Sequence, residues 1–193
     1  MLPFAVAGGA LALEIATHLI DFDAYHLRIR LLDSSYEWSW SHLLATVAFA
    51  AGAIAGWIGA MRPIPHRRVW LTICGLFAFL FVDNLTRLHE HIAVWPLIYA
   101  PLLAGLFVAI AAVTRKTDGA VIVATGIGLL FVSLAIHVFG PQFVSMLDWG
   151  VNSWPYQVKI AVKEGTELAG WVLLVPALGR LAFGAEPRLL QAR

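Results

Sequence analysis

The chain alternates long apolar stretches with short polar segments, and this pattern predicts membrane-spanning helices. A helix needs about 20 apolar residues to cross roughly 30 Å of hydrocarbon. The stretches that meet this requirement are residues 3–20, 39–60, 70–92, 95–114, 119–140 and 157–182. They are too long for membrane-spanning strands and do not alternate apolar with polar residues as such strands do. The pattern therefore predicts an all-α fold, an integral membrane bundle of six transmembrane helices in one domain covering residues 1–193.

The composition also indicates that most of the chain lies in lipid. Hydrophobic residues make up 60% of the 193 residues and charged residues 13%, whereas soluble domains carry about 25% charged residues. The formal net charge is +1, and no basic cluster resembles a nucleic-acid patch. We therefore expect membrane lipids as the surroundings, no nucleic acid, and a membrane protein or a second copy of the chain as the remaining kinds of partner.

Basic residues in the short loops predict the orientation. Arg62, Arg67 and Arg68 lie between the second and third stretches, and Arg115 and Lys116 lie between the fourth and fifth. Short loops rich in lysine and arginine stay in the cytoplasm. Both termini are therefore predicted to be cytoplasmic, in a multi-pass protein of a bacterial inner (plasma) membrane.

Small residues recur at four-residue spacing in the second stretch, at Ala48, Gly52, Gly56 and Ala60. Such a stripe lets two helix backbones approach closely. We expect it to pack within the bundle rather than against a second copy.

Ionisable residues gather at the end of the bundle that this orientation places on the periplasmic side. Each charged side chain at membrane depth costs about 2.5–3.5 kcal/mol, so we expect these groups to face one another. The predicted site residues are Glu14, His18, Asp83, Arg87, His89, Glu90, His91, His137, Lys163, Glu164 and Glu167.

Helical spacing supports a shared site. Asp83, Arg87 and Glu90 follow one helical face, and His89 is turned away from it. The same spacing rule places two further sets on one face each, namely Glu14, His18 and Asp21, and Lys159, Lys163 and Glu167.

A metal-dependent enzyme is the first functional hypothesis. Carboxylates and imidazoles that project into a helical bundle form di-iron and related centres, and these ligands suit iron, manganese or zinc. One Fe, Zn or Mn ion could then activate water or oxygen against a membrane-phase substrate. Glu164, Glu167, Lys163 and Arg87 would act as the acid, base or orienting groups. The candidate metal ligands are Asp83, His89, Glu90, His91, His137, Glu14 and His18.

Other readings stay open. The same residues could form an ion-paired network that fixes helix register in a non-catalytic accessory subunit of a larger membrane complex. They could also form a proton relay in a proton-coupled transporter, although the inner halves of the helices are almost free of polar residues. Haem held by two histidines is a weaker alternative.

Two segments resemble a family of uncharacterised bacterial multi-pass membrane proteins. Residues 83–90 read Asp-Asn-Leu-Thr-Arg-Leu-His-Glu, and residues 163–170 read Lys-Glu-Gly-Thr-Glu-Leu-Ala-Gly. That family has a DE…HE motif at the end of one helix and an EE…E…G motif in the last, and the resemblance implies no activity. Asn84 and Lys163 stand where the family has acids, which favours one metal ion, or none with Lys163 as the replacement cation. The residues that the resemblance assigns to one site are Asp83, His89, Glu90, Glu164 and Glu167.

Overall fold

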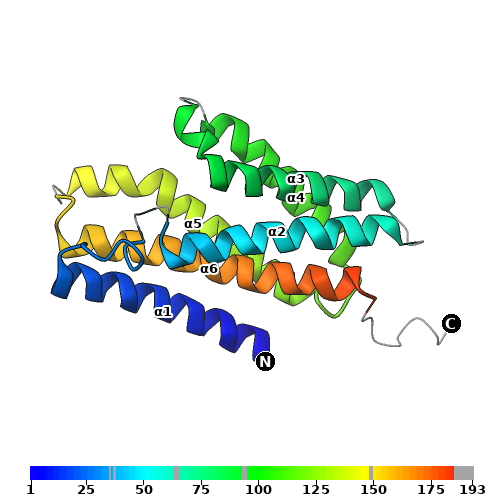
Figure 1. Ribbon diagram of the computed structural model, residues 1–193, viewed down its shortest axis with the longest axis horizontal. Coiled ribbons are helices and arrows are strands. Elements are labelled where there is room, and N and C mark those ends of the chain that lie inside the picture. Colours follow the sequence, from blue (N-terminus) through cyan, green and yellow to red (C-terminus); the bar gives the residue numbers. More distant parts are fainter. Residues whose placement is uncertain (35, 37, 63–65, 93–94, 148–149, 185–193) are drawn as a thin grey trace. The chain divides into compact units, whose positions relative to one another are not determined.

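The computed structural model describes residues 1–34, 36, 38–62, 66–92, 95–147 and 150–184, with the side chains of Glu90, Trp95, Pro96 and Pro141 left out. Within these ranges the chain is all-helical and forms no β-strand (Figure 1). The elements are α1 (Leu2–Tyr25), α2 (Trp40–Met61), α3 (Arg67–Thr86), the short 3-10 helix η1 (Leu88–His91), α4 (Trp95–Thr114), α5 (Ala120–Met146) and α6 (Trp154–Ala182).

Five of these helices are long and apolar enough to cross a membrane, which indicates a membrane protein. They are α1, α2, α3, residues Leu97–Thr114 of α4 and residues Ala120–Gly140 of α5. The remaining long helix, α6, is not among them, and it carries Lys159, Lys163, Glu164 and Glu167 in its first half. The count of six spans and the cytoplasmic termini therefore remain predictions.

The end of α3 differs from the sequence prediction. The helix was expected to continue to residue 92, but it stops at Thr86 because Arg87 adopts a left-handed conformation with φ 56°. The backbone N–H of Arg87 donates to the carbonyl of Asp83 at 2.7 Å, and η1 follows. The prediction that Asp83, Arg87 and Glu90 share one helical face is therefore wrong, since the helix ends between them.

The other boundaries lie closer to the prediction. The fourth helix has the predicted bounds, because Trp95 begins α4 and a proline is tolerated in the first turn of a helix. The fifth was expected to end at residue 140, yet α5 continues to Met146. Proline at residue 141 therefore does not end this helix.

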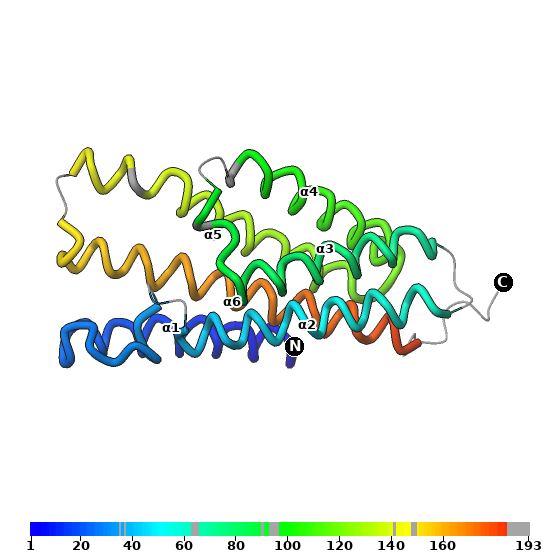
Figure 2. The backbone as a smooth tube through the Cα atoms, turned by 45° about the horizontal axis from the view of Figure 1, so that its top comes forward, coloured from blue at the N-terminus to red at the C-terminus, as the bar shows by residue number. Residues whose placement is uncertain are grey.

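The chain forms two compact units, each assembled from separate parts of the sequence. The first contains Met1–Val47 and Thr125–Leu173, and the second contains Ala48–Ala124 and Leu174–Arg193. In the first unit, α1 and α6 lie side by side (Figures 1 and 2). Their contact is close at Gly165, where an added Cβ would lie 2.7 Å from Cδ1 of Leu11.

Close packing in the second unit depends on the glycines of α2. A Cβ at Gly52 would lie 2.6 Å from the ring of Phe77, and one at Gly56 would lie 2.6 Å from the backbone nitrogen of Cys74. Both contacts are with α3, so the expectation that the small-residue stripe packs within the molecule is confirmed at these two positions. Helix α3 also packs against α4 (Figure 2).

The contact at Gly56 leads to a stability prediction. In Gly56→Ala the new methyl group meets the α3 backbone, which cannot move aside as a flexible side chain could. We expect a loss of about 1–3 kcal/mol in the free energy of unfolding, measured in detergent micelles. The control is Gly75→Ala on α3, where an added Cβ meets nothing within 4 Å and no loss is expected. Equal stability of Gly56→Ala and wild type would contradict the close approach of α2 and α3.

Candidate functional site

The polar face of α1 is fully buried in the first unit. Glu14, His18 and Asp21 each have 0% exposure, which confirms the prediction that they share one helical face. Burial of three ionisable groups on a mostly apolar helix requires partners for them. The partners come from the loop after α1, from the start of α2 and from α6.

His18 is held in one tautomer by a series of directional hydrogen bonds. Gln157 Nε2 donates to the carbonyl of Val151 at 2.6 Å, so Gln157 Oε1 must be the acceptor of the 2.8 Å bond to His18 Nε2. The backbone N–H of Ser34 donates to His18 Nδ1 at 3.0 Å. Nε2 is therefore the donor and Nδ1 the acceptor of these bonds, and Asp33 Oδ1 lies 3.7 Å from Nδ1. Because both ring nitrogens are occupied, His18 does not act as a metal ligand in this arrangement.

Asp21 holds the turn that ends α1. Its backbone carbonyl accepts hydrogen bonds from the N–H groups of His26 and Leu27, both in the left-handed conformation. Its Oδ1 accepts the N–H of Ile29 at 3.1 Å. Asp21 therefore stabilises the loop that carries Ser34 to His18.

Glu14 is the most isolated acid of the site. Its Oε1 accepts the hydroxyl of Ser41 at 2.8 Å, and the side chains of Ser34 and Glu164 lie near its carboxyl group. Among the described residues no lysine, arginine or histidine nitrogen lies within 4 Å of it. Glu14 is thus a buried carboxyl group beside a second carboxylate, with hydroxyl groups as its neighbours.

The acids of α6 share one lysine. Lys163 Nζ lies 2.7 Å from Glu164 Oε1 and 3.6 Å from Glu167 Oε2. Ser133 of α5 donates to Glu167 Oε2 at 3.3 Å. Lys163 therefore lies within ion-pair distance of both carboxylates.

His42, at the start of α2, completes this site and was missed by the sequence analysis. Its Nδ1 lies 3.0 Å from the carbonyl of Tyr36, and since a carbonyl only accepts, Nδ1 carries a proton. Its Nε2 faces Glu164 Oε2 at 3.8 Å. Helical spacing could not have linked His42 to α6, although its place at the start of a helix beside the polar loop was a usable signal.

We call this group of residues on α1, α2 and α6 the polar centre. It comprises Glu14, Ser41, His42, Lys163, Glu164 and Glu167.

A hydrolytic triad is not formed here, although its residue types are present. Ser39 Oγ lies 3.3 Å from His42 Nδ1, and His42 faces Glu164. The carbonyl of Tyr36 requires that Nδ1 keep its proton, so this nitrogen cannot accept the serine proton as a general base must. Ser39 is also fully buried. The arrangement therefore does not produce a nucleophilic serine.

The remaining predicted residues lie mostly in the second unit. Asp83 accepts the backbone N–H of His89 at Oδ1 and contacts His89 Nδ1 at Oδ2, both at 2.9 Å. The expectation that His89 turns away from Asp83 is therefore wrong, because the break after α3 folds His89 back. His91 Nδ1 contacts the carbonyl of Arg87 at 3.0 Å. The side chain of Glu90 lies outside the described residues.

The predicted metal ligands are divided between the two units. His91 is exposed in the second unit, and His137 is exposed on α5 of the first. In the part of the chain that the structure describes, no group of three or more His, Cys, Asp or Glu residues could hold a metal ion. The structure brings Glu14, Glu164 and Glu167 together, and it pairs Asp83 with His89. The metal hypothesis gains no support from this geometry.

In the part of the chain that the structure describes, the fold is all-helical, with five helices long and apolar enough to span a membrane and a cluster of ionisable groups in the first unit. The chain belongs to the family DUF8692, a domain of unknown function, whose model matches residues 1–181. No curated protein and no solved structure matches it. The expectation of an uncharacterised family is thus confirmed, and the family supplies no activity.

The fixed tautomer of His18 can be tested through Gln157. In Gln157→Leu the Nε2–H of a fully buried imidazole loses its acceptor, which costs about 1–3 kcal/mol in the free energy of unfolding. The matched control is Gln142→Leu, because Gln142 is exposed on α5 and should change stability by less than about 0.5 kcal/mol. If both variants unfold at the same detergent concentration, the hydrogen-bond series through His18 is not a stabilising element.

Proposed function

We propose that this chain is an integral membrane protein that binds and releases a proton in the polar centre, and that Lys163 takes the place of a metal ion there. The observation that carries the proposal is the environment of Glu14, which is fully buried beside Glu164, a carboxylate that already pairs with Lys163. A buried carboxylate without a cation close by takes up a proton rather than remain charged.

The charges of the polar centre support this proposal. It contains three carboxyl groups, and within the described ranges Lys163 is the only lysine or arginine within 4 Å of any of them. A protonated His42 would add a second positive charge beside Glu164. One negative charge would still remain, so a neutral centre needs a proton on one carboxyl group. We assign that proton to Glu14.

Proton exchange would run from Glu14 through Glu164 to His42, in the order of increasing exposure. The side chain of His42 is 22% exposed, whereas Glu14 is 0% exposed. Beyond the polar centre, residues 47–61 of α2 and 168–179 of α6 contain no ionisable side chain. The proton therefore exchanges with one side of the protein only, which favours a proton-responsive membrane protein over a transporter with a route across the bilayer.

The proton on Glu14 can be detected by infrared spectroscopy. We expect the carboxylic C=O band of wild type at neutral pH to contain a component that disappears in Glu14→Gln. Glutamine resembles a protonated glutamic acid in shape and keeps an acceptor for Ser41, so Glu14→Gln should lose less than about 1 kcal/mol of stability. The control is Asp118→Asn, because Asp118 is exposed and should contribute no such component.

Two results would count against this proposal. If the carboxylic C=O band is the same in Glu14→Gln as in wild type, Glu14 does not carry a proton. A loss of several kcal/mol in Glu14→Gln, without a spectral change, would show that a charged Glu14 is needed for the fold, as the alternative of a purely structural ion-paired network requires.

The role of Lys163 gives a second test. Lys163→Gln leaves Glu164 and Glu167 without their cation and should cost up to about 3–5 kcal/mol. The double variant Lys163→Gln with Glu164→Gln removes one of these charges and should recover part of the loss, which a double-mutant cycle in detergent would measure. If the losses of stability in the two single variants simply add up in the double variant, Lys163 and Glu164 are not energetically coupled.

Elemental analysis separates the proposal from the metal-dependent enzyme. We expect the metal content of purified wild type and Glu167→Gln to be the same. One near-stoichiometric transition metal that is present in wild type and lost in Glu167→Gln would overturn the role assigned to Lys163.

A further inference from the structure

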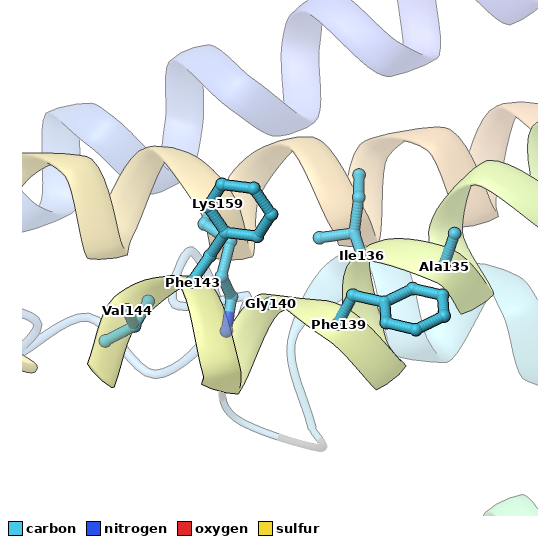
Figure 3. Close-up of a pocket in the computed structure, with 7 residues that line it drawn as sticks. All are labelled: Ala135, Ile136, Phe139, Gly140, Phe143, Val144 and Lys159. Atoms are coloured by element: carbon cyan, nitrogen blue, oxygen red, sulfur yellow. The ribbon is translucent and has the colours of Figure 1, made fainter. Parts of the chain in front are cut away.

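A groove of about 360 Å³ lies between α5 and α6 of the first unit. Figure 3 shows its lining, with Phe139, Phe143 and Val144 on α5 and the stem of Lys159 coming from α6. Phe139 and Phe143 are 62% and 65% exposed. The groove is therefore an open apolar surface with one positively charged side chain.

Lys159 reaches the groove because residue 140 has no side chain. An added Cβ at Gly140 would lie 3.0 Å from Cδ and 3.6 Å from Nζ of Lys159. The ammonium group lies 4.8 Å from the centre of the Tyr156 ring. No carboxylate in the described part of the chain lies within 4 Å of it. The positive charge of Lys159 is thus available to an anion in the groove.

The groove lies at the end of an apolar span, which is where lipid headgroups would be in a membrane. The apolar span of α5 ends at Gly140, which is in the middle of the lining. Lys159 is five residues from the start of α6 at Trp154, which is about 7.5 Å along the helix axis. A lysine near a helix end extends its ammonium group toward the membrane interface while its stem stays on apolar surface.

We propose that this groove binds an anionic phospholipid of the surrounding bilayer. One acyl chain lies along Phe139 and Phe143, and the phosphate pairs with Lys159. The argument is charge complementarity, because the lining has one cation and no acid, and basic pockets between membrane helices are suited to anionic headgroups. The stem of Lys159 crosses Gly140, where the apolar span of α5 ends, so a phosphate at its ammonium group would have apolar surface of α5 beside it for an acyl chain.

The test measures lipid selectivity of the full-length protein. Purified protein in detergent is mixed with phosphatidylglycerol and phosphatidylcholine of identical acyl chains, and bound lipid is counted by native mass spectrometry. A single basic residue near the membrane surface contributes about 1 kcal/mol of attraction to anionic lipid, so wild type should prefer phosphatidylglycerol about fivefold. Lys159→Gln should bind both lipids equally, and Lys159→Arg should keep the preference.

Matched variants make the result specific to the groove. Lys116→Gln removes a lysine from the loop between α4 and α5 and should leave the preference unchanged. Gly140→Leu should weaken it, because the new side chain occupies the path of Lys159. Glu14→Gln should also leave it unchanged, so failure of the proton site and failure of the lipid site are distinguishable.

Several outcomes would overturn the proposal. One is the same fivefold preference in Lys159→Gln as in wild type. Another is equal binding of both lipids by wild type, which would mean that the groove takes acyl chains without regard to charge. Release of bound lipid by millimolar inorganic phosphate would indicate a free-anion site. A protein that carries no lipid and is dimeric would indicate that a second copy covers the groove.

Discussion

The ion pair between Lys163 and Glu164, with 2.7 Å between Nζ and Oε1, is the interaction on which the polar centre depends. Helix α6 carries its charges inside the first unit, where each charged group needs a partner. Lys163 satisfies Glu164 and Glu167 from the same helix. The neighbouring helices add a hydrogen bond from Ser133 to Glu167 and the imidazole of His42 beside Glu164. Glu14 accepts a hydrogen bond from the hydroxyl group of Ser41. For this reason our proposal assigns the proton to Glu14.

Two backbone carbonyls give His18 and His42, two of the histidines of this unit, different roles. The carbonyl of Val151 orients Gln157, so His18 donates through Nε2 to Gln157 and accepts at Nδ1 from the backbone of Ser34. The carbonyl of Tyr36 fixes only one nitrogen of His42, and the other faces a carboxylate. His18 therefore holds the loop after α1 against α6, whereas His42 connects the start of α2 to Glu164 of α6.

The helices could be predicted from the sequence because apolar length is a local property. The bounds of α4 match the prediction, and α1 and α2 differ from it by only a few residues at each end. The break after α3 could not be predicted, because it depends on Arg87 taking the left-handed conformation that glycine usually takes. Because the helix ends at this residue, His89 contacts Asp83. Arg87 and Glu90 do not continue the helical face of Asp83 as expected.

The sequence by itself determined that the chain is helical, that its helices are long and apolar, and that Glu14, His18 and Asp21 lie on one face, because all of these follow from the period of a single helix. Only the tertiary structure decided which acid lies closest to Lys163, which tautomer His18 adopts and that His42 faces Glu164. These contacts join helices that are distant along the chain, as in the bond between His18 and Gln157, 139 residues apart. Packing of side chains from several helices selects such partners, and no local spacing rule contains that information.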